Sequence, residues 1–140
     1  MGNSPTIGQG PGNLVPDSKV MRFLAAEAIS KGECVCLTTA QGSASYSVSL
    51  ADQATGLYHV IGVAKEDIAS GDWGTIVVGG YCAYVIGDAA ITAGDYIGPS
   101  TTPGTSDTIV IGTATWDAFG VALSDDTATI FDALIFNRIG

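Results

Sequence analysis

Few side chains in this sequence have the type and spacing that catalysis requires. The chain has one histidine, His59, so a Ser-His-Asp or Cys-His arrangement would have to use it. His59 lies in the run LYHVI at residues 57–61, whose composition is typical of a strand rather than of an exposed loop. We therefore expect no catalytic role for His59, and we predict that the protein is not an enzyme.

Two pairs of adjacent acids are the remaining candidates for chemistry: Glu66 with Asp67, and Asp125 with Asp126. Paired carboxylates can hydrolyse glycosides or bind Ca²⁺. Both pairs fall at predicted turns, where solvated charge is the usual explanation, and neither has the dense run of oxygen ligands that a calcium loop needs. The glycines form no phosphate-binding fingerprint. A hydrolase is thus the weakest function that we consider, and we expect no cofactor.

The cysteines predict neither a disulfide framework nor a metal site. Cys34 and Cys36 are two apart, which puts them on the same face of a strand. With Cys82 and one histidine they supply too few ligands for a structural zinc site. We expect all three thiols to be buried and reduced, which fits assembly in a reducing cytoplasm.

Composition favours one compact domain whose surface is largely covered by other protein. Charged residues make up 14% of the 140, which is low against about 25% for a typical soluble domain. The net charge of −9 argues against binding to nucleic acid or to an anionic membrane surface. No apolar run approaches the length that spans a bilayer, and the N-terminus lacks the basic and apolar regions of a signal peptide.

Short apolar and aromatic runs between glycine and aspartate predict an all-β fold. The stretch 61–86 sets the pattern, with two strands expected to bracket Gly79-Gly80 as a hairpin. Residues 17–29 fit a helix or a strand, and the turn that follows them favours the strand. A long loop is expected at 98–106, and a final strand at 130–139 is apolar on both faces, as in a sandwiched strand. The other predicted elements are strands at 34–38, 46–50 (half-exposed), 57–61 and 108–115, a strand starting at Tyr96, and one helical turn at 51–55.

Two motifs recur in the same order along the chain. The form Ile-x-x-Gly-acid occurs at 29–33, 68–72 and 91–95, and Gly-Val-Ala followed by an aspartate occurs at 62–67 and 120–125. This order indicates a two-fold internal repeat of about 60 residues. The alternative is that Gly-acid is simply a favourable turn dipeptide after a strand.

The first residues differ in composition from the rest of the chain. Residues 1–16 are rich in glycine, proline and asparagine, and we predict an extended N-terminal arm followed by a single β domain at 17–140. The arm is either a disordered terminus or an extension that lies on a neighbouring subunit. In the second case Ile7, Leu14 and Val15 would be its apolar anchors.

Several of these segments resemble the capsid decoration (cement) proteins of tailed bacteriophages. The matching runs are AISKGECV at 28–35, IGVAKED at 61–67 and ASGD at 69–72. The resemblance covers about 23–85 and is looser beyond, through AGD at 93–95 and GVA at 120–122. It implies a small Gly-rich β-barrel or β-tulip-like domain with an N-terminal arm, and it brings no catalytic residues.

The same resemblance implies a function and partners. Such proteins are made in the host cytoplasm and bind the exterior of the expanded capsid as homotrimers, at three-fold and quasi-three-fold positions. There they clamp neighbouring copies of the major capsid protein. The aromatic residues Trp73, Tyr81, Tyr84 and Trp116 are our candidate contacts with the capsid or a neighbouring subunit. The alternative is a carbohydrate- or receptor-binding β module, in which these residues and Tyr96 would stack on sugar rings.

Overall fold

The computed structural model describes residues 18–38, 47–55, 59–88, 90–109 and 118–136, and these residues form an all-β protein. Its strands make one nine-stranded sheet in the order β1-β3-β2-β4-β5-β9-β8-β6-β7. The strands are β1 (Ser18–Ala25), β2 (Cys34–Leu37), β3 (Ser47–Leu50), β4 (Val60–Ala64), β5 (Trp73–Ile86), β6 (Tyr96–Pro99), β7 (Ser106–Thr108), β8 (Gly120–Ala122) and β9 (Ile130–Ile135). The predicted fold class is confirmed. The predicted arm lies outside the described residues, so the division at residue 16 stays a prediction.

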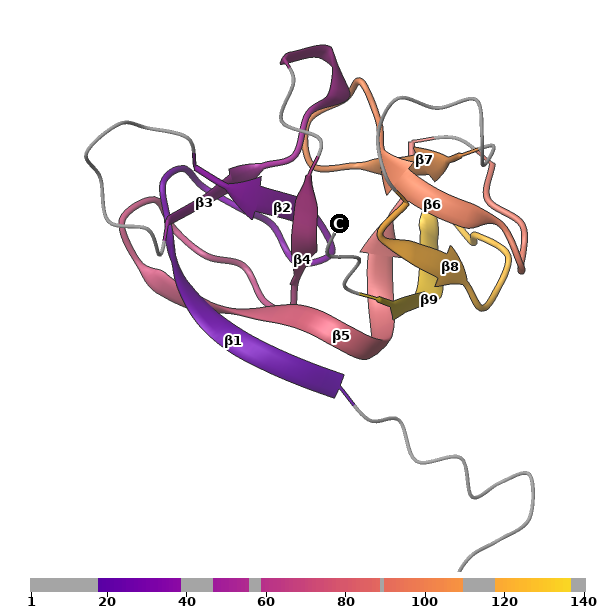
Figure 1. The fold of residues 1–140 in the computed structure, drawn as a ribbon, viewed down its shortest axis with the longest axis horizontal. Helices are drawn as coiled ribbons and strands as arrows, with labels where there is room; N and C mark the ends of the chain where they lie inside the picture. Colours follow the sequence, from indigo (N-terminus) through magenta and orange to yellow (C-terminus); the bar gives the residue numbers. More distant parts are fainter. Residues whose placement is uncertain (1–17, 39–46, 56–58, 89, 110–117, 137–140) are drawn as a thin grey trace, which may run out of the picture.

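The first five strands close on themselves as a five-stranded β-barrel (Figure 1). β1 pairs in parallel with β3 at Leu24 and Ala25, and antiparallel with the first half of β5. β2 and β4 complete the circuit between β3 and β5. Closure satisfies the main-chain groups of these strands within the barrel and leaves few open edges.

β5 is one continuous strand of 14 residues, so the predicted hairpin at Gly79-Gly80 is wrong. β1 pairs with both glycines, and β9 pairs with β5 from Gly80 onward. Gly80 has a φ of 84°, and the register with β1 shifts between Lys19 and Val20, which marks a β-bulge. The bulge bends β5 instead of reversing it. Its first half therefore belongs to the barrel and its second half to the strands beyond (Figure 1).

The connectivity of the barrel is repeated by five further elements: the second half of β5 together with β6, β7, β8 and β9. We call them the second ring. β6 pairs with β7 and β8, as β2 pairs with β3 and β4, and β9 pairs with β8, as β5 pairs with β4. A single parallel bridge, Gly87 with Ser106, stands where β1 pairs with β3 in the barrel. The second ring is thus a looser copy of the first.

The recurring motifs build the same turn contact in both halves. In the barrel, Gly32 has a φ of 90°, its N–H donates to the Ala64 carbonyl (2.8 Å), and the Ala64 N–H donates to the Glu33 carbonyl (2.9 Å). Glycine is favoured there because other residues resist positive φ.

In the second ring, Gly94 has a φ of 94°, its N–H donates to the Ala122 carbonyl (2.7 Å), and the Ala122 N–H donates to the Asp95 carbonyl (2.8 Å). The predicted internal repeat is therefore confirmed, because both motifs hold each other through equivalent hydrogen bonds.

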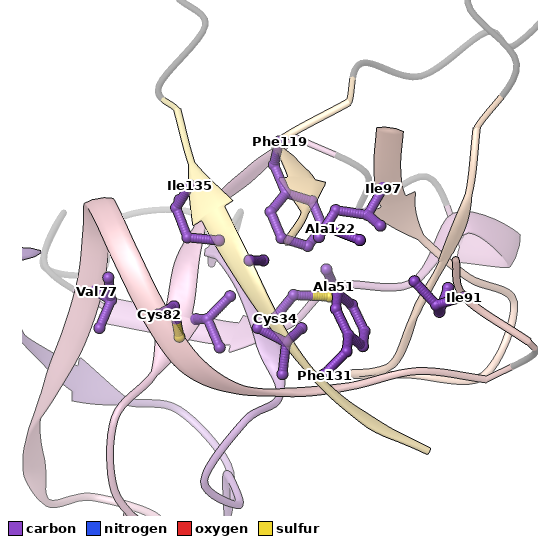
Figure 2. Close-up of a cluster of buried hydrophobic side chains, with 13 residues drawn as sticks. Cys34, Ala51, Val77, Cys82, Ile91, Ile97, Phe119, Ala122, Phe131 and Ile135 are labelled. Carbon is purple, nitrogen blue, oxygen red and sulfur yellow. The ribbon is translucent and has the colours of Figure 1, made fainter. Parts of the chain in front are cut away.

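Two apolar clusters fill the molecule, and the strands between them are buried on both faces. Adjacent residues of β2 point in opposite directions: Val35 packs in the barrel interior, and Cys34 packs in the cluster that fills the second ring. Val63 and Ala64 of β4 divide in the same way. Figure 2 shows the cluster of the second ring, in which Phe131 and Ile135 of β9 pack with Phe119 and with Cys34 and Val77 of the barrel.

β9 is buried on one face only, which corrects the predicted sandwich. Phe131, Ala133 and Ile135 are 2%, 0% and 3% exposed, but Leu134 between them is 43% exposed. No described element covers the outer face of the second ring. Large apolar residues on both faces of β9 predicted that both faces are buried. Among the described residues, none covers the face that carries Leu134.

The predicted loop at 98–106 is mostly a tight hairpin that packs inward. β6 continues to Pro99 and β7 begins at Ser106, and both residues are fully buried. Gly104, with a φ of 82°, receives a hydrogen bond from the Cys34 N–H (2.9 Å) and donates one to the Ala51 carbonyl (2.8 Å). The hairpin therefore fastens the second ring to the barrel.

Other local predictions are met in part. The helical turn is a 3-10 helix, η2 (Gln53–Thr55), and the strand expected at 57–61 begins at Val60 and continues to Ala64. β3 is buried rather than half-exposed, because Ser47 and Ser49 also lie inside. The strand expected at 108–115 overlaps β7 only at Thr108, because Ile109 is not in a strand, and residues 110–115 fall outside the described residues.

Candidate docking surfaces

The acid pairs fasten turns. In the barrel, Asp67 Oδ1 accepts the Lys31 N–H (2.8 Å) and Glu66 Oε2 accepts the Thr75 N–H (2.9 Å). A carboxylate that accepts a main-chain N–H completes the turn contact between neighbouring strands. These two acids therefore have a structural task, where the sequence suggested only solvated charge.

The second pair does the same in the second ring. Asp125 Oδ1 accepts the Ala93 N–H (2.9 Å), and Asp126 Oδ1 accepts the Ile91 N–H (3.0 Å). Asp67 and Asp125 occupy equivalent places, each bonded to the residue before the positive-φ glycine of the facing turn.

The three cysteines are free and buried, as predicted. Burial raises the pKa of the Cys34 thiol to about 12 and that of Cys36 to about 11, and it also raises the pKa of Cys82. Thiols held in this way are inert, because the thiolate is the reactive form. No group of three or more His, Cys, Asp or Glu within the described ranges is placed to hold a metal ion. No helix in those ranges is long and apolar enough to cross a bilayer.

The predicted contact residues do not form one surface. Trp73, at the start of β5, is 50% exposed and lies opposite Leu24 of β1. Tyr81 and Tyr84 are partly buried in the second half of β5, beyond the bend. Ile7, Leu14, Val15 and Trp116 lie outside the described residues. The structure therefore divides the visible candidates between the barrel and the second ring.

Tyr81 and Tyr84 line a pocket of about 290 Å³ where β5 passes from the barrel to the second ring. Lys31 and Lys65 are on its wall, and the Lys31 ammonium lies 4.6 Å from the centre of the Tyr84 ring, a cation–π contact. The Tyr81 hydroxyl donates to Asp132 Oδ2 (2.8 Å), and this bond is the main cause of the raised pKa of the phenol. Two ammonium groups beside two aromatic rings can bind a carboxylate or a polar ring.

Charge is distributed unevenly between the two halves. No lysine or arginine lies between Lys65 and Arg138, whereas aspartates recur throughout that interval. The described basic side chains are Lys19, Arg22, Lys31 and Lys65, and none of them forms an ion pair with another described residue. Lys19 and Arg22 lie on an exposed stretch of β1. The barrel thus holds all the described basic side chains, together with acids of its own, whereas the charged side chains described in the second ring are all acidic.

An apolar surface on the second ring was missed by sequence reasoning. Tyr96 pairs with Val121, Val121 with Leu134, and Leu134 with Tyr81, so four side chains on four adjacent strands share the outer face. We call these four residues the apolar ladder. Tyr96 is 46% exposed and Leu134 43%. The sequence contained the residues, but the ladder exists only in the register of the strands.

Comparison with known proteins adds a fold relationship. No protein-family model matches the chain, and no curated protein matches it in sequence. Among solved structures, the chain is similar to the head fiber gp8.5 N base in bacteriophage phi29, with a TM-score of 0.58 and 16% sequence identity. The similarity covers 87% of this chain and 97% of that one. The fold resembles that of a phage head fiber base.

Identity at this level relates folds and says nothing about shared residues. The match covers 87% of this chain, so it includes strands of both the barrel and the second ring.

Proposed function

We propose that this protein is a structural component of a phage virion that binds the outside of the expanded head as a decoration protein. The observation that carries the proposal is the fold similarity over 97% of a phage head fiber base. Two independent features support it: the motifs shared with cement proteins, and exposed apolar side chains on both halves of the molecule, including Trp73, Tyr96 and Leu134. Contiguous exposed apolar surface is a mark of protein interaction sites.

In this proposal the partners are the major capsid protein and other copies of the same chain. A homotrimer fits three-fold and quasi-three-fold positions, and it clamps neighbouring capsid subunits after expansion. The arm at 1–16 extends over the shell from the 17–140 domain, with Ile7, Leu14 and Val15 as anchors. A ligand that binds only the expanded shell stabilises that shell by mass action.

The direct test is to mix the purified protein with expanded capsids that lack it and to image the particles. We expect density at three-fold and quasi-three-fold positions and a higher rupture temperature than that of bare shells. Unexpanded procapsids serve as the control and should stay bare. Equal rupture of decorated and bare shells would refute the stabilising role, and dimeric density would refute the trimer.

The second candidate is a carbohydrate- or receptor-binding module. The half-exposed ring of Trp73 and the exposed Tyr96 favour it, since such rings stack on sugars. Titration with glycans, followed by tryptophan fluorescence and by NMR line broadening, separates the two functions. A decoration protein gives no response, and saturable binding would favour the module.

A further inference from the structure

The apolar ladder has a counterpart in the barrel that is already covered. The repeat places Cys34, Val63 and Val77 where the second ring has Tyr96, Val121 and Leu134, and the cross-strand pairs are equivalent. In the barrel these three side chains are 0%, 0% and 2% exposed. They are buried because the second ring packs over them (Figure 2).

The ladder of the second ring has no such cover among the described residues. Its side chains are nevertheless of the large apolar kind that proteins usually bury, and Tyr96 and Leu134 are almost half exposed. The same structural position is therefore buried in one repeat and open in the other. In repeat proteins, a surface that is buried in one repeat and exposed in the last one is where a further unit can pack.

A second exposed surface lies on β1. Residues 19–22, which we call the basic edge, are exposed on both sides of the strand, with Val20 46% and Met21 54% exposed between Lys19 and Arg22. This part of β1 pairs only with β5, so its other edge has no described strand beside it. In Figure 1 it runs along the lower side of the molecule, while β6 and β8 lie at the right.

We propose that the apolar ladder of one copy binds the basic edge of a second copy. Asp95 adjoins Tyr96 of the ladder and accepts the Thr92 N–H, and Asp132 accepts the Tyr81 hydroxyl. On the basic edge, Arg22 donates to the Trp73 carbonyl, and neither Lys19 nor Arg22 has an ion-pair partner among the described residues. Opposite charge around apolar centres selects this pairing over a contact between two identical faces. The sizes also agree, because four adjacent strands span about 14 Å and residues 19–22 extend over about 10 Å.

This contact is heterologous, because two different surfaces of the chain meet. Heterologous contacts close into a ring when the rotation between copies permits. The inference therefore specifies the subunit interface of the homotrimer proposed above and rests on that proposal. It also gives the low charge content of the chain a structural reason, since both exposed apolar surfaces are covered in the ring.

The test uses full-length variants and needs no capsid. Leu134→Asp disables the ladder, and Lys19→Glu with Arg22→Glu disables the basic edge. Leu37→Asp is the matched control, because Leu37 is 44% exposed and lies on β2, outside both surfaces. Tyr96→Ser is a second ladder variant, in case Leu134→Asp does not fold by circular dichroism. Masses are measured by sedimentation equilibrium up to about 1 mM, the effective concentration of neighbours tethered to one shell.

We expect trimers for the unaltered protein and for the Leu37→Asp control. Either disabled variant should associate at least about tenfold more weakly, which is the effect of removing a central contact residue from an interface. An equimolar mixture of the two variants should form heterodimers only, because one intact contact remains between them. Monomers of the unaltered protein at the highest concentration, trimers of either disabled variant, or no heterodimer in the mixture would each overturn the inference. Capsid decoration is scored separately, so trimers that fail to bind shells would refute the proposed function and leave the interface standing.

Discussion

The close approach of β4 and β5 at Gly62 predicts a large loss of stability from a single methyl group. A Cβ at Gly62 would lie 2.3 Å from the Val77 carbonyl oxygen and 2.7 Å from Ile76 Cγ2. The carbonyl belongs to the main chain, so no side-chain rotation relieves the contact. The two strands would have to separate by about 1 Å at the centre of the barrel, where overpacking costs roughly 1–3 kcal/mol or more.

We expect Gly62→Ala to lower the free energy of unfolding by about 3 kcal/mol, the upper part of that range, because the cross-strand pairing is lost as well. Urea unfolding followed by tryptophan fluorescence measures the change. For a chain of this size the midpoint should fall by about 1–2 M. Gly120→Ala, at the equivalent site of the second ring, places its Cβ 2.7 Å from the Leu134 carbonyl oxygen and should also destabilise, though by less.

Two other glycines separate crowding from backbone strain. Gly71 has a φ of 87° and open space around its Cβ position, so Gly71→Ala should cost only the left-handed strain of about 1–2 kcal/mol. Gly79 has neither feature, since its nearest neighbour is Lys19 Cβ at 3.9 Å, and Gly79→Ala should change stability by less than about 1 kcal/mol. The reasoning is wrong if Gly62→Ala is no more destabilising than Gly79→Ala.

Four further predictions concern titration, thiols, the arm and salt. Burial is the chief cause of the raised pKa of Glu33, so the ionised carboxylate lowers the free energy of unfolding above that pKa, and this loss is absent below pH 4.5. Glu33→Gln should therefore raise the free energy of unfolding at pH 7 and leave it unchanged at pH values below 4.5. Urea unfolding at both pH values measures the difference. The thiols of Cys34 and Cys36, with pKa values of about 12 and 11, should resist maleimide at neutral pH until urea unfolds the chain, and rapid labelling of the native protein would contradict their burial. Deletion of residues 1–15 should leave the circular dichroism spectrum unchanged and reduce occupancy on capsids, and unchanged occupancy would exclude a binding role for the arm. Decorated capsids should keep most of their decoration at about 1 M salt if docking is mainly apolar, and stripping by salt alone would reject apolar docking.

Local chemistry was sufficient to predict the class of fold and the turns. Glycine at 32, 71 and 94 adopts positive φ, as the Gly-acid motifs predicted, because the preference for that conformation belongs to the residue itself. The repeat was visible for the same reason, since two copies of a turn contact require two copies of its residues. Burial of the cysteines followed from their apolar surroundings and from the lack of other ligands.

The predictions that failed concern features that depend on which strands pair with or cover a segment. Gly79-Gly80 has the composition of a hairpin, but pairing of β1 and β9 on either side of the bend keeps β5 continuous. The alternating apolar residues of β9 look the same whether one face or both are covered. The glycine, proline and serine residues of 98–106 are typical of an exposed loop, yet the Gly104 N–H donates a main-chain hydrogen bond to the Ala51 carbonyl.

The sequence by itself determined the all-β class, the positions of the turns, the repeat and the acidic balance, because each follows from the residues or from their order. The tertiary structure decided which apolar residues are core and which are surface. Cys34 and Tyr96 hold equivalent places in the two repeats, and one is buried while the other is 46% exposed. The difference arises because the second ring packs on this face of the barrel, whereas no described element packs on the outer face of the second ring. That asymmetry is a property of how strands from distant parts of the chain meet, and it defines the candidate docking surfaces.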